Sequence, residues 1–168
     1  EINWQGEYIM KIMYFNLINL DNPKTMGICN KIKGQVKVFD KYFSNSYRTV
    51  LTNKGIIVKE NDIIVGEKKF NHTKFDFIEK RVVYYKYINE FIKSNNIEIL
   101  YVRYPLADPF FINFLKECKK AGMKIYLEIA TYPYDKELGK MTLLVDRLFR
   151  KRLSNYVDKI LTFSDYER

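Results

Sequence analysis

Short apolar runs alternate with helix-periodic segments along most of this chain, and that alternation is its strongest constraint on the fold. The apolar runs, each typical of a strand buried on both faces, are residues 8–16, 97–102, 124–130 and 157–163. The segments with helical periodicity are residues 28–43, 75–95, 108–121 and 139–155. Strands that alternate with helices favour right-handed crossovers and a largely parallel sheet covered on both sides. The sequence therefore predicts an α/β domain, Rossmann-like, with three layers and a mostly parallel sheet.

One region departs from this alternation. Three short β-branched runs follow one another between residues 47 and 69, with no helical segment between them. The breaks at Asn53-Lys54-Gly55 and Asn61-Asp62 have the composition of tight turns. We therefore expect a small β-meander insertion at about 47–69.

Ligands of such sheets bind beyond the carboxyl ends of the strands. That rule selects the loops at 17–27, 103–109 and 131–137 as the functional edge. The first loop contains neither a G-x-G-x-x-G dinucleotide motif nor a GxxxxGK[ST] phosphate loop, and Gly27 stands alone before the helix. Gly27 either makes a plain turn or leaves the first backbone N–H groups of the helix free to meet an anionic or hydroxyl-rich ligand.

Two charged residues lie in or next to the apolar strands, where charged side chains are unusual and need a partner or a function. Arg103 follows the run at 97–102 directly, and Glu128 lies inside the run at 124–130. Arg103 either pairs with a nearby carboxylate such as Asp108 or holds a ligand phosphate or carboxylate through its planar fork. A buried carboxylate is costly unless it is paired. Glu128 therefore either meets Arg103 across adjacent strands or acts as an acceptor-orienting group or general base.

The charge of the chain favours an anionic partner. There are 29 basic and 20 acidic residues, and the formal net charge is +9. Part of this charge lies in the last helical segment, beside an apolar stripe of Leu144, Leu148 and Phe149. The basic residues there are Arg147, Arg150, Lys151 and Arg152. They form either the solvated face of a packed helix or a surface that docks on anionic lipid. Nucleic-acid binding would depend on charge alone, and we expect none.

Several other classes of function find no support in the sequence. Cys29 and Cys118 have no metal-ligand spacing, and no nucleophile set can be assembled around His72, the one histidine. We expect no metal site. No apolar run approaches the roughly 18 residues of a membrane span, and no signal peptide is visible. We expect a cytoplasmic protein, with residues 1–9 as an extension or a vector-derived remnant.

Five stretches carry a resemblance to a known family. They are Met26-Gly27-Ile28, residues 33–39, Tyr101-Val102-Arg103-Tyr104-Pro105, residues 126–134 and residues 158–164. In order and spacing, these stretches resemble the amino-terminal domain of family-4 GT-B glycosyltransferases of bacterial surface-polysaccharide assembly. The likeness covers residues 10–168. Many members have a histidine in a loop at the edge of this domain, whereas this chain reads Glu-Ile-Ala-Thr-Tyr-Pro at 128–133.

The resemblance implies a retaining, hexosyl-type glycosyltransferase. Such an enzyme moves a sugar from a nucleotide-sugar donor to a glycan or polyprenyl-linked acceptor at the inner face of the membrane. Its amino-terminal domain holds the acceptor, and a carboxyl-terminal domain, absent from residues 10–168, holds the nucleotide. The implied catalytic residue is Glu128. The implied acceptor-side residues are Gly27, Arg103, Tyr104, Thr131, Tyr132 and Asp135. No cofactor is implied beyond the nucleotide-sugar, and residues 10–168 alone are expected to be inactive.

An alternative comes from a different class of protein. The chain also fits a non-catalytic, flavodoxin-like regulatory or interaction domain that binds an anionic partner. A receiver domain would need an acidic cluster at the end of the first strand, where Asp21 is the one nearby acid. A gene that ends near residue 168 would favour this alternative, and roughly 150–200 further residues with a second α/β pattern would favour the enzyme.

Overall fold

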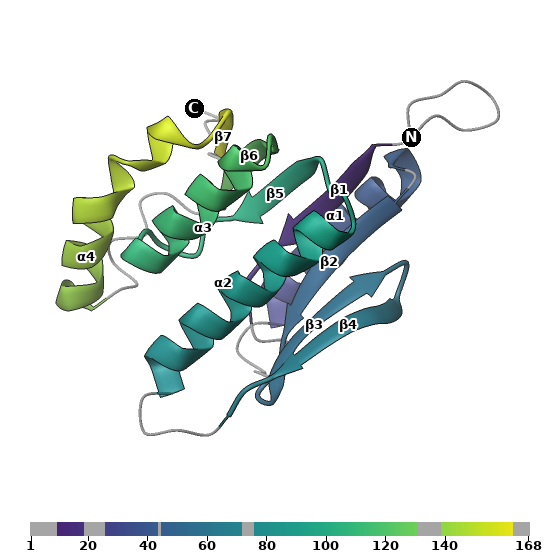
Figure 1. The fold of residues 1–168 in the computed structure, drawn as a ribbon, viewed down its shortest axis with the longest axis horizontal. Coiled ribbons are helices and arrows are strands. Elements are labelled where there is room, and N and C mark those ends of the chain that lie inside the picture. The colour runs from purple at the N-terminus through teal and green to yellow at the C-terminus, as the bar shows by residue number, and fades with distance from the viewer. Residues whose placement is uncertain (1–9, 19–25, 44, 72–75, 131–138, 163–168) are drawn as a thin grey trace.

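The computed structural model describes residues 10–18, 26–43, 45–71, 76–130 and 139–162. In these residues seven strands form one sheet, in the order β4-β3-β2-β1-β5-β6-β7 (Figure 1). The strands are β1 (Lys11–Phe15), β2 (Asn45–Leu51), β3 (Gly55–Glu60), β4 (Ile63–Lys69), β5 (Ile99–Arg103), β6 (Lys124–Ile129) and β7 (Lys159–Thr162). The helices are α1 (Met26–Tyr42), α2 (Asp76–Ser94), α3 (Pro109–Lys120), α4 (Lys140–Arg150) and the short 3₁₀ helix η2 (Leu153–Asn155).

The sheet is mostly parallel, which confirms the predicted fold class. β2, β1, β5, β6 and β7 run parallel, and β3 and β4 are antiparallel strands at one edge. The β-meander at 47–69 is present, but its first strand pairs with β1, so the meander continues the main sheet and is not a separate insertion. Asn61 and Asp62 both have positive φ angles, 46° and 71°, as a two-residue type I′ hairpin turn requires.

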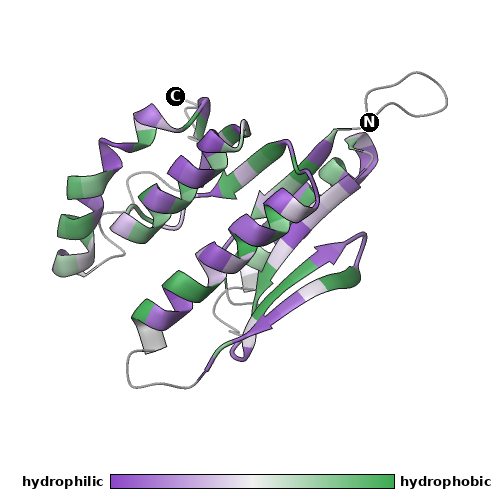
Figure 2. Cartoon of the chain, viewed as in Figure 1, coloured by the Kyte–Doolittle hydropathy of each residue, from purple (hydrophilic) through white to green (hydrophobic). Residues whose placement is uncertain are grey.

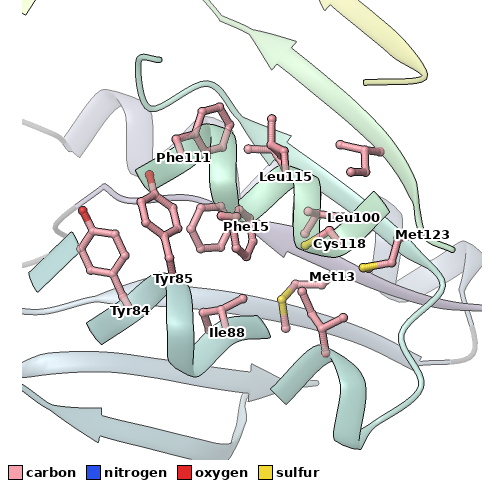
Figure 3. Close-up of a cluster of buried hydrophobic side chains, with 14 of the residues drawn as sticks. Met13, Phe15, Tyr84, Tyr85, Ile88, Leu100, Phe111, Leu115, Cys118 and Met123 are labelled. Carbon is pink, nitrogen blue, oxygen red and sulfur yellow. The ribbon is translucent and has the colours of Figure 1, made fainter. Parts of the chain in front are cut away.

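Helices cover both faces of the sheet, and β1 shows how its residues divide between them. Met13 and Phe15 belong to the larger hydrophobic core under α2 and α3, whereas Ile12 and Tyr14 belong to a smaller core under α1. This alternation follows from the two-residue period of a strand. Figure 3 shows Phe15 packed among aromatic side chains of α2 and α3. The centroid of its ring lies 5.0 Å from that of Phe114.

The ends of α3 match the signals in the sequence. Asp108 is the N-cap and accepts a hydrogen bond from the backbone N–H of Phe111 at 2.8 Å, and Pro109 occupies the first helical position. Gly122 follows the helix with a φ angle of +82°, a conformation that glycine adopts without strain. These caps place the start of α3 directly after the loop that leaves β5.

The buried stripe of α2 differs from the one that its periodicity predicts. The sequence predicts a buried stripe made of Phe77, Ile78, Val82, Tyr85, Ile88 and Phe91 or Ile92. Of these, Ile78 and Val82 are 50% and 44% exposed. Tyr85 and Ile88 are buried as predicted, and Tyr84 is buried as well. The reason is that α2 packs against α3 as well as against the sheet, so the buried face turns toward the neighbouring helix.

Candidate functional site at the carboxyl edge of the sheet

The chain changes direction within the sheet between β1 and β5. It adds β2, β3 and β4 on one side of β1, returns through α2, and then adds β5, β6 and β7 on the other side. Ligands of open α/β sheets bind in the crevice outside the carboxyl ends of the two strands at such a switch point. A cavity of about 220 Å³ lies there. Its lining includes Leu17, Ile18, Arg81, Tyr84, Arg103 and Tyr104, and we call it the switch-point cavity.

The chain leaving β1 is fixed by two buried polar residues. The backbone N–H of Asn16 donates to Thr49 Oγ1 at 2.9 Å, and the Thr49 hydroxyl donates to the Asn16 carbonyl oxygen at 2.9 Å. Asn16 Nδ2 also donates to the Thr49 carbonyl oxygen at 2.9 Å. These bonds tie the end of β1 to β2, and Asn16 Oδ1 accepts from the N–H of Ile18 at 3.2 Å. The backbone just before Leu17 and Ile18 is therefore held in place, and these two residues line the cavity.

A buried ion pair positions the arginine of β5. Arg103 Nη1 lies 2.9 Å from Glu128 Oε1, and Gln35 Nε2 of α1 donates to the other carboxylate oxygen at 2.9 Å. Tyr14 Oη donates in turn to Gln35 Oε1 at 3.0 Å. Glu128 has no exposed surface, and the side chain of Arg103 is 11% exposed. Both oxygens of Glu128 thus serve to hold other residues, and Arg103 alone of this pair reaches the cavity.

This ion pair decides between the pairings that the sequence left open. Arg103 meets Glu128 across β5 and β6, which share the register Arg103–Glu128. The expected partner Asp108 pairs with Arg81 of α2 instead, so the predicted contact of Arg103 with Asp108 is wrong. The Asp108 carboxylate caps α3 with one oxygen and pairs with Arg81 through the other.

Two phenols next to this ion pair hold their protons more tightly than usual. Burial, and then the negative charge of Glu128, raise the pKa of Tyr14 from 10.0 to about 12. The same two causes raise the pKa of Tyr101, which faces the same carboxylate from β5. Both phenols are therefore neutral near pH 7. Among the described residues around Glu128, Arg103 is the cation that pairs with its carboxylate.

These shifts predict a loss of stability at alkaline pH. A group whose pKa is higher in the folded protein stabilises it fully below the unfolded pKa, here about 10, and loses that contribution as the pH rises through the folded value. The free energy of unfolding should therefore fall between about pH 10 and pH 12. Urea titrations at several pH values measure it, and Tyr14→Phe should flatten the fall. Burial also raises the pKa values of Tyr84 and Cys118, so part of the fall should remain in that variant. A slope identical to that of the parent chain would contradict the assignment to Tyr14.

The loop after β5 is held by a carboxylate from α4. Asp146 is fully buried, accepts from the hydroxyl of Tyr104, and accepts from the backbone N–H of Ala107 at 2.7 Å. Between these two residues Leu106 has a φ angle of +79°, which is strained for a side chain of that size. Arg150 Nε and Nη2 donate to Asp146 Oδ2 at 2.9 and 2.5 Å. Asp146 therefore fixes Tyr104 in the cavity wall.

A larger cavity elsewhere is a weaker candidate. It has a volume of about 330 Å³ and lies between α1 and the strands β2 and β3. Its arginine, Arg48, pairs with Asp62 and lies 4.0 Å from Asp40, so two carboxylates already face that guanidinium. Three lysines, Lys33, Lys37 and Lys59, also line this cavity. Position at the switch point of the sheet favours the smaller switch-point cavity.

The structure places the predicted site residues unequally. Arg103 and Tyr104 line the cavity together. Gly27 lies in the first turn of α1, is exposed, and is not among the described residues that line the cavity; a Cβ there would meet no atom within 4 Å. Thr131, Tyr132 and Asp135 lie outside the described residues, as does His72.

The basic residues predicted for the last helical segment differ in their exposure. Arg147, Lys151 and Arg152 are exposed, as a docking surface requires. Arg150 pairs with the buried Asp146, and its side chain is 33% exposed, so its guanidinium is already engaged within the helix. The spacing of four between Asp146 and Arg150 explains the pairing, because residues four apart share one face of a helix.

Several residues of the site were missed in the sequence. Gln35 interrupts a helical segment as a polar residue on the face that the structure buries, and this position was the available signal. Asp146 gave no signal, because an aspartate on a helix is ordinarily a surface residue. Arg81 gave no signal, because an arginine on a helix is ordinarily a surface residue. Its place in the cavity depends on α2 crossing the switch point, which pattern alone does not reveal.

The described residues bring together no cluster of three or more histidine, cysteine, aspartate or glutamate side chains of the kind that holds a metal ion. The cavity is lined by two arginines, each paired with a carboxylate, and by two tyrosines and apolar residues. Comparison with protein-family models gives no match for this chain, and searches of curated proteins and of solved structures give none either. The function is therefore argued from the switch-point cavity itself.

Proposed function

We propose that this chain is the acceptor-side domain of a GT-B glycosyltransferase and that the switch-point cavity binds an anionic part of the acceptor. One observation carries the proposal: two arginines and two tyrosines line a cavity at the point where ligands of doubly wound sheets bind. Guanidinium groups suit phosphate and carboxylate oxygens. The faces of aromatic rings suit the apolar faces of sugar rings. The sequence resemblance supplies the reaction class.

Each residue has a defined part in this proposal. Arg103 and Arg81 contact the anionic group, and Tyr84 and Tyr104 pack against the neighbouring part of the acceptor. Glu128 positions Arg103 and does not itself act as the base, because both of its oxygens are engaged and it has no exposed surface. The donor is a nucleotide-sugar held by a second domain. The acceptor is a glycan or a polyprenyl-linked sugar at the cytoplasmic face of the membrane.

Binding of inorganic pyrophosphate to the 168-residue chain tests the site. We expect Arg103→Lys to weaken the affinity by about tenfold, because lysine keeps a positive charge for Glu128 but loses the planar fork. Arg48→Lys is the matched control, since Arg48 is similarly buried and paired but lines the other cavity. Isothermal titration calorimetry measures both. Equal affinities for Arg103→Lys and the parent chain would exclude this cavity as the anion site.

A second measurement tests the reaction class. In an enzyme that joins this chain to a donor-binding domain, Arg103→Lys should lower sugar transfer from a radiolabelled nucleotide-sugar, while Arg48→Lys should not. Pyrophosphate binding without any transfer would instead support the alternative, a non-catalytic flavodoxin-like domain. One observation favours that alternative: the five parallel strands follow the order β2-β1-β5-β6-β7, which is the 2-1-3-4-5 order of flavodoxin-like sheets.

A further inference from the structure

Helix α4 turns its apolar side chains away from the domain. Met141, Leu144 and Leu148 are 74%, 53% and 64% exposed, although an amphipathic helix on a sheet ordinarily buries such residues. Figure 2 shows α4 at the outer side of the molecule, with apolar bands along it. Three large exposed side chains on an 11-residue helix form a surface that needs a partner.

The orientation of α4 is fixed by its polar inner face. Asp146 is the one residue of α4 that is fully buried, and it bonds to the loop after β5 and to Arg150. Phe149 packs at the edge of the main core. At about 100° per residue, Leu144 and Leu148 lie roughly opposite Asp146. The helix therefore cannot roll its apolar side inward without breaking the buried bonds of Asp146.

Basic residues surround the exposed apolar side chains. Lys140, Arg147 and Lys151 fall within the same third of the helix circumference, and all three are exposed. Arg152 follows, with its guanidinium 5.1 Å from the ring of Phe149. The one acidic residue of α4 is the buried Asp146. We call this surface the α4 outer face, and it consists of Lys140, Met141, Leu144, Arg147, Leu148, Lys151 and Arg152.

We propose that the α4 outer face docks on an anionic membrane surface. An apolar stripe bordered by lysine and arginine is the composition of helices that lie in the lipid headgroup region, where apolar side chains insert and basic ones meet anionic headgroups. No helix in the described part of the chain is long and apolar enough to cross a bilayer, so the contact is peripheral. Four of the seven residues of this face are basic. Charged residues are depleted at the cores of protein–protein interfaces, which makes a protein partner the poorer fit.

Vesicle flotation of the 168-residue chain tests the proposal. The probes are vesicles of phosphatidylcholine with about one third phosphatidylglycerol, and vesicles of phosphatidylcholine alone. We expect binding to the anionic vesicles that falls with added salt. Leu144→Ser with Leu148→Ser should weaken it by about tenfold or more, because two inserted side chains are lost. Arg147→Gln with Lys151→Gln should weaken it by roughly tenfold as well.

Matched controls come from α1, on the opposite face of the sheet. Val38 and Tyr42 are 52% and 71% exposed, and Lys37 and Lys41 are exposed beside them. Val38→Ser with Tyr42→Ser, and Lys37→Gln with Lys41→Gln, remove the same kinds of groups and should leave vesicle binding unchanged within twofold. All substituted residues are exposed, so circular dichroism should show that every variant folds.

Three results would overturn the proposal. The first is an absence of binding to anionic vesicles. The second is equal loss in the α1 and α4 variants, which would mean that net charge or general apolar exposure controls binding. The third is a dimer, seen by analytical ultracentrifugation, that Leu144→Ser with Leu148→Ser dissociates while vesicle binding persists. That outcome would assign the α4 outer face to a second copy of the chain.

Discussion

Replacing Glu128 with alanine should destabilise the domain by about 3–5 kcal/mol, the range measured when one partner of a buried ion pair is removed. The variant leaves the guanidinium of Arg103, 11% exposed, without its carboxylate, and leaves Gln35 Nε2 without its acceptor. Urea denaturation followed by circular dichroism measures the change. We expect the apparent pyrophosphate affinity to fall as well, because Arg103 loses the group that fixes its orientation.

Two further variants separate the causes of this loss. Glu128→Gln keeps the shape and one acceptor oxygen and should cost clearly less than Glu128→Ala. Glu117→Ala removes a carboxylate from a solvent-exposed pair with Lys120 and should leave stability nearly unchanged. A Glu128→Ala variant as stable as the parent chain would show that the ion pair does not hold Arg103 in place.

Replacing Asp146 with alanine should cost about 2–4 kcal/mol, because several buried donors lose one acceptor. The backbone N–H of Ala107 and the hydroxyl of Tyr104 both bond to this carboxylate, and Arg150 pairs with it. The strained backbone at Leu106 lies between the first two. We therefore expect local loosening of the loop after β5 in addition to the global loss, visible as faster amide exchange at Ala107.

The control for this variant is a carboxylate in a similar role at the surface. Asp158 accepts from the N–H of Ile125 at 2.8 Å and pairs with Lys119, and its side chain is 36% exposed. Asp158→Ala should cost much less, because water replaces the lost bonds. If Asp146→Ala and Asp158→Ala had equal effects, burial of Asp146 would not be the source of its stabilising role.

The fold was predictable because its signals are local. Apolar runs and helical periodicity lie within single elements, and each boundary depends on a few neighbouring residues, as the cap at Asp108 and the turn at Asn61-Asp62 show. The exposed side of α2 was not predictable in the same way. Which of Ile78, Val82 and Tyr84 enters the core depends on where α3 lies, and that is a property of the assembled domain.

The candidate site was predictable only in part, for a related reason. Arg103 and Glu128 stood out because charges on apolar strands are unusual. Their pairing was one of the alternatives considered, whereas Arg81 and Asp146 were missed because helices normally carry arginine and aspartate at the surface. A charged residue on an apolar strand could therefore be recognised from the sequence as a candidate site residue. A charged residue whose side chain points inward from a helix could not. The role of Glu128 as a positioning residue required both of its contacts to be seen.

The bonds of Asp146 have a mechanical consequence. The carboxylate joins the inner side of α4 to the backbone at Ala107 and to the hydroxyl of Tyr104. We therefore expect the helix and this side of the switch-point cavity to move together. A force that tilts α4 must either break these hydrogen bonds or displace Tyr104 relative to Arg103. The width of the switch-point cavity should therefore depend on the orientation of α4, whose opposite side faces outward.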